Sequence, residues 1–357
     1  MDRRLFLTAA GAFALAAADR VATPLDAQVV RTGPGSLSLT WTGARTVSVF
    51  ASSDPAADRP AMRALRTASG GGSELVAQPS PRPYFLARAA DGRQVRIAER
   101  LLPLQGGRNF RDLGGWRTAD GQQVRWGRLY RSGVMNGLTL ADLDYLRGLG
   151  IVAICDLRAP SERDAEPNPF LKIAGPNVVA IGYDRAAAVS GLMKMTTREQ
   201  AVQGFADAYV DFLDLLAPYF TDLFARLVAG QAPLAFNCSA GKDRTGMASA
   251  LVLSVLGVPR QTVIADYALS ETYVPPALYL EQMARGEAIG GFSLPQTQAL
   301  AKLPPEVLKV ILGADPEVMR RALAIIDARY GGPTAVAEAR FGLTQGKIAA
   351  LRRVYLY

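Results

Sequence analysis

Ten residues, 237–246, carry the groups whose chemistry stands out in this 357-residue chain: Asn-Cys-Ser-Ala-Gly-Lys-Asp-Arg-Thr-Gly. A short apolar segment precedes them and an apolar helical pattern follows, which predicts a strand, a tight loop and a helix. In that arrangement the loop N–H groups and the helix N-terminus converge on one point and form an anion site. The same positive field favours the thiolate of Cys238, so the site could both hold a phosphate and attack it.

Arg244, six residues after Cys238, supplies the second requirement of such chemistry. Its planar guanidinium binds two phosphate oxygens at once and stays charged at any relevant pH. Thr245 is expected to donate a hydroxyl hydrogen bond to the sulfur and to ease its later departure. The other loop residues expected to bind the substrate phosphate are Ser239, Ala240, Gly241 and Lys242.

The string from Cys238 to Gly246 resembles the phosphate loop of protein tyrosine phosphatases. With Asn-Phe-Arg-Asp-Leu-Gly-Gly at residues 109–115, it is similar to the bacterial branch that acts on phosphotyrosine and often on phosphoserine, phosphothreonine and phosphoinositides. The resemblance covers roughly residues 105–357 and implies an α/β fold whose central, mostly parallel sheet is flanked by helices. A catalytically weak phosphate- or phosphoinositide-binding module and a sulfur-transfer enzyme with a similar loop are the alternatives.

The chain contains no histidine, which excludes Ser-His-Asp hydrolysis, histidine bases and histidine-ligated metals. The implied mechanism needs no metal or other cofactor: the Cys238 thiolate attacks phosphorus, a phosphocysteine forms, and water hydrolyses it. A carboxylic acid must then protonate the leaving oxygen. The candidates are Asp243, Asp156 and Asp184. Asp243 is preferred because it lies inside the loop and because the resemblance also points to it, whereas Asp184 sits where the mobile acid loop of other tyrosine phosphatases comes in chain order.

Two residues of the loop invite a closer interpretation. Lys242 adds a cation beyond Arg244 that would attract substrates with more than one phosphate, although a lysine pointing into solvent is an equal alternative. Asn237 departs from the family pattern, in which histidine normally precedes the cysteine and supports the thiolate. Because asparagine can donate a hydrogen bond but carries no charge, we expect a less stabilised thiolate and slower catalysis than in relatives.

The net charge of +8 and the pI near 9.6 fit an acidic or phosphorylated partner. The basic residues are scattered and form no run interleaved with aromatic residues, so we expect a phosphorylated protein or a phosphoinositide as partner and no nucleic acid. The two cysteines, Cys155 and Cys238, are too few for a disulfide framework or a four-cysteine zinc site. Cys155 is predicted to be a buried small hydrophobe, with oxidative pairing to Cys238 as the alternative.

Residues 1–27 are predicted to be an export signal peptide. Arg3 and Arg4 precede an uncharged stretch at 5–18, and small residues suited to cleavage follow at 16–18 or near Ala27. The stretch is too short to span a membrane, so the mature chain should have no integral membrane segment. Residues 2–7 resemble a twin-arginine signal, which implies a periplasmic or secreted protein; an ordinary secretory signal is the alternative.

Residues 28–100 are predicted to form a small all-β sandwich domain of immunoglobulin or fibronectin type. Leu37, Leu39 and Trp41 alternate with polar residues, and stretches rich in Gly, Pro and Ser separate the apolar segments. We interpret this domain as a packing or targeting module. In the alternative of a carbohydrate- or partner-binding domain, Trp41 would be the clearest aromatic candidate, although a core position is preferred.

Residues 101–357 are predicted to form the catalytic domain, with a buried strand at 151–157 that delivers Asp156 and Arg158 to its carboxyl end. Helical periodicity between Phe205 and Leu227 predicts a helix pair packed on the sheet, and residues 186–197 could form a mobile lid. Arg111 and Asp112 are expected to hold neighbouring segments in place. Further helices are predicted at 139–149, 261–273, 305–312, 316–330, 335–339 and 345–354.

Overall fold

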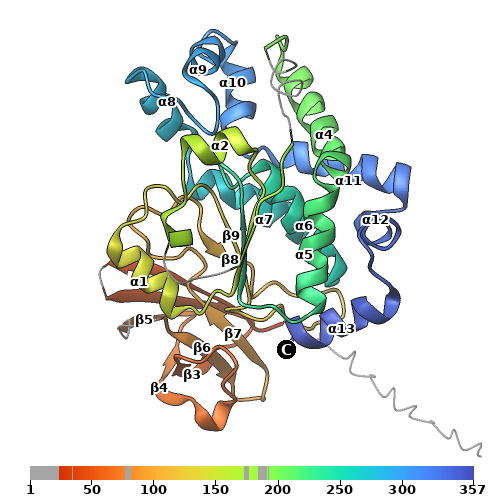
Figure 1. Cartoon of the computed structure of the whole chain (residues 1–357). Helices are drawn as coiled ribbons and strands as arrows, with labels where there is room; N and C mark the ends of the chain where they lie inside the picture. The colour runs from red at the N-terminus through yellow and green to blue at the C-terminus, as the bar shows by residue number, and fades with distance from the viewer. Residues whose placement is uncertain (1–23, 34, 77–81, 173–176, 184–190, 192) are drawn as a thin grey trace, which may run out of the picture.

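The computed structural model describes residues 24–357 except 34, 77–81, 173–176, 184–190 and 192. A β-sandwich and a larger α/β part lie against each other (Figure 1). Residues 1–23 of the predicted export signal lie outside the described residues. Asp184 and much of the segment 186–197 also lie outside them. Within the described residues, no helix is both long and apolar enough to cross a membrane.

The β-sandwich consists of two antiparallel sheets. One contains β1 (Asp26–Gly33), β2 (Ser36–Thr42) and β5 (Gly72–Val76) in the order β1-β2-β5. The other contains β3 (Thr46–Ser52), β4 (Arg63–Ser69), β6 (Tyr84–Ala89) and β7 (Gln94–Ala98) in the order β4-β3-β6-β7, and a 3-10 turn (Arg59–Ala61) precedes β4. Leu37, Leu39 and Trp41 point into the shared core, as their alternation predicts. The predicted sandwich is therefore confirmed, and Trp41 is a core residue whose indole N–H donates to the Ala44 carbonyl.

The first strand begins at Asp26, two residues before the boundary expected for this domain. Ala27 pairs with Trp41, so a cleavage after Ala27 would cut into β1, whereas cleavage at residues 16–18 would leave β1 whole. The domain boundaries and the export signal stay predictions.

The α/β part is organised around a five-stranded sheet of β8 (Arg111–Asp112), β9 (Leu129–Ser132), β10 (Ala153–Asp156), β11 (Asn177–Val179) and β12 (Leu234–Asn237). The strand order is β11-β10-β12-β9-β8, and only β8 runs antiparallel to its neighbour. Every residue of β9, β10 and β12 is buried, because helices cover both faces of the sheet. The mostly parallel sheet is confirmed.

Successive side chains of these strands point to opposite faces of the sheet and pack into two different hydrophobic cores. Cys155 and Phe236 face the larger core, whereas Ile154 and Ala235 face a smaller one that includes residues of α1. Figure 1 shows α1 on one side of the sheet and α5, α6 and α7 on the other. The central helix α6 is buried along nearly its whole length, so the segment that follows the cysteine is held from all sides.

The helices of the described part are α1 (Leu140–Gly148), α2 (Pro160–Ala165), α4 (Arg198–Leu215), α5 (Ala217–Val228), α6 (Asp243–Val255), α7 (Arg260–Tyr273), α8 (Pro276–Ala284), α9 (Leu294–Leu300), α10 (Pro305–Leu312), α11 (Pro316–Tyr330), α12 (Pro333–Arg340) and α13 (Gln345–Tyr355), with a 3-10 turn at Pro169–Lys172. The helix pair α4 and α5 and the later helices agree with the apolar periodicity. Thr139, Asp315 and Thr344 cap helix N-termini, and Gly331 ends α11 in the left-handed conformation. The sequence did not predict α2, α8 and α9, which are short and begin at or next to a proline.

A buried ion pair joins the β-sandwich to the α/β part. Arg82, just before β6, places Nη1 2.6 Å from the Asp112 carboxylate, and both side chains are almost inaccessible to solvent. Asp112 also accepts hydrogen bonds from the backbone N–H groups of Gly114 (2.7 Å) and Gly127 (2.8 Å). Asp112 thus fixes the turn after β8, in agreement with the supporting role expected for it.

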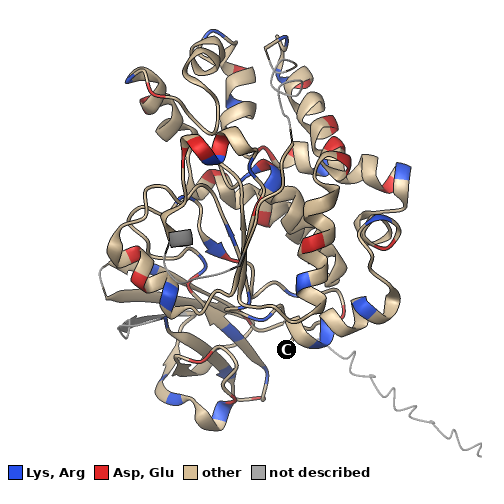
Figure 2. Ribbon diagram, viewed as in Figure 1, with Lys and Arg blue, Asp and Glu red and all other residues tan. Residues whose placement is uncertain are grey.

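Charged residues are distributed over both parts. Figure 2 shows Lys and Arg on the β-sandwich strands and on most helices, interspersed with Asp and Glu, and α2 carries a cluster of acidic residues. No described element stands out as a continuous basic track, which agrees with the scattered charge of the sequence.

Replacing Arg82 tests the buried link. Arg82→Met should lower the free energy of unfolding by about 3–5 kcal/mol, because the Asp112 carboxylate would stay buried without its partner. Urea denaturation measures the change. Arg285→Met is the control, since Arg285 forms an exposed pair with Glu287, and the loss of a solvated pair should change the free energy of unfolding far less. Equal effects of the two substitutions would contradict the argument.

Candidate active site

The cysteine loop, residues 238–242, joins the end of β12 to the start of α6. Cys238 lies at its beginning and is 1% exposed. Gly241 has a φ of +69°, and a Cβ on it would lie 2.6 Å from the Ser132 carbonyl carbon, so only glycine fits there. The strand, tight loop and helix predicted around the cysteine are therefore present.

The carbonyl groups of the loop point outward, because donors from other segments hold them. The Ser239 oxygen accepts from the Val134 N–H at 2.9 Å. The Gly241 oxygen accepts from Asn109 Nδ2 at 2.9 Å and from Arg131 Nη2 at 3.0 Å. In a trans peptide the next N–H points the opposite way, so the N–H groups of the loop face inward. They donate to no residue that the structure describes, and with the α6 N-terminus they form an anion cradle beside Cys238.

The residues that hold the loop are themselves fixed from α7. Arg131 pairs with Asp266, and Arg111 donates to the Asp266 carbonyl at 2.8 Å and to Ser270 at 3.1 Å. Arg111 also donates to Asn109. All of these side chains are buried, so the orientation of the Gly241 carbonyl is set by a network that spans β8, β9 and α7.

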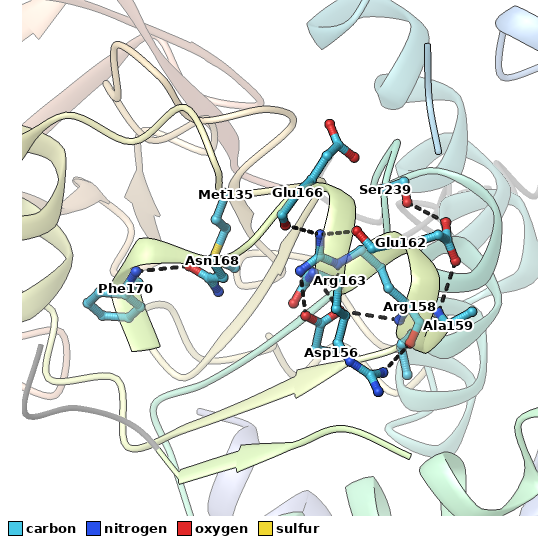
Figure 3. A network of polar contacts seen from close by, with 12 residues as sticks. Met135, Asp156, Arg158, Ala159, Glu162, Arg163, Glu166, Asn168, Phe170 and Ser239 are labelled. Carbon is cyan, nitrogen blue, oxygen red and sulfur yellow. Dashed lines mark hydrogen bonds and ion pairs between the residues drawn. The ribbon is translucent and has the colours of Figure 1, made fainter. Parts of the chain in front are cut away.

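Arg244 makes a two-pronged ion pair that the sequence did not reveal. Its Nη1 lies 2.7 Å from Glu162 Oε2, and its Nη2 lies 2.8 Å from Glu162 Oε1. Nη1 also donates to the Tyr183 hydroxyl at 2.6 Å. The Ser239 hydroxyl donates to the same Glu162 carboxylate at 2.6 Å, and Figure 3 shows Glu162 of α2 pointing toward Ser239. Glu162 therefore connects α2 both to Ser239 of the loop and to Arg244 of α6.

The remaining donors of Arg244 are suited to a phosphate. Its Nε–H and one Nη2–H have no acceptor among the described residues, and a guanidinium binds an oxyanion through such a pair. Burial alone would lower the pKa of Arg244, but the Glu162 carboxylate outweighs burial and holds that pKa well above its usual value. The guanidinium is thus oriented and permanently charged.

Asp243 occupies the first position of α6 and is 25% exposed at its side chain. Tyr209 of α4 donates its hydroxyl hydrogen bond to Asp243 Oδ1 at 2.6 Å, and the Tyr267 hydroxyl lies 2.9 Å from that of Tyr209. Burial and the Asp243 charge raise the pKa of Tyr209 well above its usual value, so Tyr209 remains a donor. Asp243 is therefore next to Arg244 in sequence, partly accessible and held in orientation.

Lys242 does not point into solvent, which corrects that alternative. Its side chain is buried, and Nζ donates to the carbonyls of Ile311 at 2.6 Å and Gly313 at 2.7 Å. Nζ also lies 3.5 Å from Asp243. These acceptors direct the ammonium toward the end of α10, so Lys242 ties the cysteine loop to α10 and contributes its backbone N–H to the cradle.

The other two acid candidates are not brought to the loop. Asp156 is fully buried and accepts from Arg158 Nε at 2.9 Å and Nη2 at 2.7 Å. Figure 3 shows this pair beside α2. Asn237 Nδ2 also donates to Asp156 at 3.1 Å, so the amide that replaces the family histidine is directed at β10. Asp184 lies outside the described residues.

Thr245, expected to donate to the Cys238 sulfur, and Cys155, expected to be a buried core residue, both lie near the strands that lead to the loop. The Thr245 hydroxyl faces the Ser132 carbonyl at 3.4 Å, which is longer than an ordinary O–H···O bond. Cys155 pairs in register with Phe236, two residues before Cys238, and both cysteines are free thiols. Burial raises the pKa of Cys155 to about 12, so it is an inert core thiol in this state. Its oxidative pairing with Cys238 stays a prediction.

The segment between α8 and α9 lies over the Ser239–Glu162 contact. Gly291 in this segment is so close that a Cβ on it would lie 2.6 Å from Ser239 Oγ. In Figure 1, α2, α8 and α9 are grouped at the same end of the molecule. Of the segment predicted as a lid, the described Met193 and Met195 pack against the main core.

Two signals in the sequence could have identified Glu162. Ala-Pro-Ser-Glu at residues 159–162 follows a buried strand, and proline at the first helical position with glutamate at the third is a helix-start pattern. A helix there directs the glutamate back toward the strand end where ligands bind in α/β sheets. Tyr209 and Tyr183 carry no comparable signal, because apolar periodicity explains tyrosine equally well.

Residues 102–357, which carry this site, match the tyrosine phosphatase family. The match spans more than half of the sequence, so the chain belongs to the tyrosine phosphatase family and is a protein tyrosine phosphatase. A Cupriavidus necator protein named as a tyrosine-protein phosphatase is 32% identical over 227 residues, which are 62% of this chain and 77% of that protein. The triple specificity protein phosphatase PtpB of Mycobacterium tuberculosis is 28% identical over 297 residues, which are 73% of this chain and 100% of that protein.

A tyrosine-protein phosphatase of Nostoc commune is 32% identical over 148 residues, or 40% of this chain and 48% of that protein. The solved structure of TpbA from P. aeruginosa in complex with phosphotyrosine covers 57% of this chain and 90% of its own at 14% identity. Its TM-score of 0.25 is too low to support an argument about the fold.

Glu162→Gln tests how far the glutamate charge orients Arg244. The amide can still accept one hydrogen bond but leaves the buried guanidinium without its counter-charge. We expect kcat/KM for a phosphotyrosine peptide to fall about 10–100-fold and the free energy of unfolding to fall by about 3 kcal/mol. Glu166→Gln is the matched control on the same segment, since Arg158 bonds the Glu166 backbone carbonyl. Unchanged kcat/KM in Glu162→Gln would show that Arg244 is positioned without it.

Proposed function

We propose that this phosphatase hydrolyses phosphotyrosine through a phosphocysteine formed on Cys238, and that the same site also accepts phosphoserine, phosphothreonine and phosphoinositides. One arrangement carries the proposal: the cysteine lies at the start of a loop whose N–H groups face inward, beside an Arg244 with two donors left over. Such a site stabilises an anion and a thiolate together, and a thiolate is a nucleophile for phosphorus.

In the first step the Cys238 sulfur attacks phosphorus in line with the bond to the leaving oxygen. The S–P bond forms as the P–O bond to the tyrosine oxygen breaks, and Asp243 gives its proton to that oxygen. In the second step water attacks the phosphocysteine, its proton returns to the Asp243 carboxylate, and the sulfur leaves as a thiolate. One carboxyl group therefore serves as acid and then as base.

Arg244 and the loop N–H groups act on the oxygens of the transferring phosphoryl group. Their charge and direction are fixed before substrate binds, because Glu162 and the Gly241 carbonyl contacts hold them. Preorganised donors of this kind need no rearrangement as negative charge develops, which is how they lower the barrier.

The proposal that the site accepts several classes of phosphomonoester is supported by the similarity to PtpB, whose name describes triple specificity. A phosphate-binding module without turnover is the competing function. The motivation is that the Asn237 amide donates to Asp156, so the Cys238 sulfur lacks the neighbouring histidine that normally supports the thiolate in the family. We further propose a periplasmic or secreted location, on the strength of the twin-arginine-like sequence at residues 2–7.

The direct test is phosphate release from p-nitrophenyl phosphate and a phosphotyrosine peptide in the presence of chelator. The wild type should turn over both, and Cys238→Ser should abolish release because serine at this position is not ionised. Cys155→Ser is the matched control, since Cys155 lies in the core, and it should retain turnover. Phosphopeptide binding without release in the wild type would support the binding module instead.

The role of Asp243 is tested by pH dependence. The first step needs the protonated acid, so kcat should fall as pH rises through its titration. Asp243→Asn should lower kcat about 100-fold and abolish this basic limb. Tyr209→Phe removes the hydrogen bond that holds the Asp243 carboxyl group in orientation, so kcat should fall, but by less than in Asp243→Asn, because the carboxyl group is still present.

Tyr355→Phe is the control for Tyr209→Phe, because the Tyr355 hydroxyl donates to the Leu227 carbonyl away from the loop. Its kcat should match that of the wild type. Full turnover with an unchanged basic limb in Asp243→Asn would exclude Asp243 as the acid.

A further inference from the structure

A cavity of about 300 Å³ lies beside the cysteine loop, between residues 105–109 and α8. Its lining includes Asn109, whose amide holds the Gly241 carbonyl of the loop. The other polar side chains on its walls are Gln105, Arg108, Tyr273, Tyr279, Glu281, Gln282 and Arg285. Nothing in the reaction described above uses this cavity.

Arg108 brings an unpaired positive charge to the cavity. Its backbone is fixed, because the Arg108 carbonyl accepts from the Gly133 N–H at 2.8 Å next to the loop. The residue is of intermediate exposure, and its guanidinium donates to no acceptor and pairs with no carboxylate among the residues that the structure describes. Arg285 differs, since it is exposed and paired with Glu287. A guanidinium without a partner in the chain keeps its N–H donors for an anion from outside the chain.

Tyr279 adds an unpaired hydroxyl to the same wall. Its side chain is 5% exposed, yet the hydroxyl forms no hydrogen bond with any residue in the described ranges. Burial raises the pKa of Tyr279 to about 12, with an opposing effect of Arg108 and further increases from Asp243 and Cys238. The geometric link between this cavity and the cysteine loop is Asn109, which lines the cavity and donates to the Gly241 carbonyl at 2.9 Å. The hydroxyl oxygen itself is not one of the fully buried polar atoms, so it is open to the cavity that Tyr279 lines and can donate to a ligand there.

We infer that Arg108 and Tyr279 form a second anion-binding subsite, which takes a second phosphate carried by the substrate next to the one that Cys238 attacks. The inference rests on the proposed function and specifies its substrate class as doubly phosphorylated molecules. The guanidinium supplies paired N–H donors and the phenol supplies an O–H donor, both suited to phosphate oxygens. Lys242, the cation first considered for this task, is instead committed to the carbonyls of Ile311 and Gly313.

The test compares kcat/KM for two substrates that differ only in the second phosphate. One pair is a phosphotyrosine peptide with and without a neighbouring phosphoserine; the other is a short-chain soluble phosphatidylinositol bisphosphate against the monophosphate. The wild type should prefer the doubly phosphorylated member of at least one pair by about tenfold, the worth of a charge-assisted hydrogen bond. The preferred pair identifies the source of the second phosphate.

Arg108→Gln should lower this preference ratio about tenfold, Arg108→Lys should retain part of it, and Tyr279→Phe should lower it about threefold. A ratio is used because a general catalytic defect lowers both substrates equally and leaves the ratio unchanged. Arg260→Gln removes the same charge at a remote exposed pair with Asp327, so its ratio should match the wild type. Tyr279→Phe keeps the test decisive if Arg108→Gln does not fold.

A wild-type ratio near one in both pairs, or equal losses in Arg108→Gln and Arg260→Gln, would overturn the subsite. Failure of the proposed function has a different signature, because the wild type would then release no phosphate from any member of either pair.

Discussion

The site depends on the outward orientation of one peptide group, the carbonyl of Gly241. Asn109 and Arg131 both donate to it, and each comes from a segment more than a hundred residues earlier in the chain. Because the peptide plane is rigid, fixing this oxygen also fixes the following N–H toward the inside of the loop. The left-handed conformation at Gly241 makes this orientation accessible. Without these contacts the loop carbonyls could face the phosphate, and the site would repel the anion that it otherwise attracts.

Contiguous features of the site could be predicted from the sequence, whereas features assembled from distant segments could not. Cys238, Asp243 and Arg244 lie within seven residues, so the strand, loop and helix around them already determine their proximity. Glu162 and Tyr209 reach the site from α2 and α4, and their roles depend on how those helices dock. In the β-sandwich, alternation predicted which side chains face the core, because the period of a strand needs no tertiary information.

Charge in this site is arranged in compensated pairs rather than as a general excess. Arg244 faces Glu162, Arg131 faces Asp266, and the Lys242 ammonium faces two carbonyls. The contacts of Arg131 and Lys242 commit these two cations to holding the backbone in place, whereas the pairing of Arg244 with Glu162 leaves two of its N–H donors for the substrate phosphate. The net charge of +8 therefore says little about the site itself, because the donors that matter are a few N–H groups left over after these pairings. Arg108 stands apart from this arrangement, since the described residues offer it no partner.

The Arg82–Asp112 pair also links the evolution of the β-sandwich to that of the α/β part. Asp112 belongs to the α/β part and fixes the backbone at Gly114 and Gly127, but its counter-charge comes from the β-sandwich. A recombination event that exchanged or deleted the sandwich would leave a buried carboxylate without its cation, at a cost of several kcal/mol. Such an event would survive only with a compensating substitution at residue 112. The two parts are therefore expected to evolve as one unit, with the residues at positions 82 and 112 changing together.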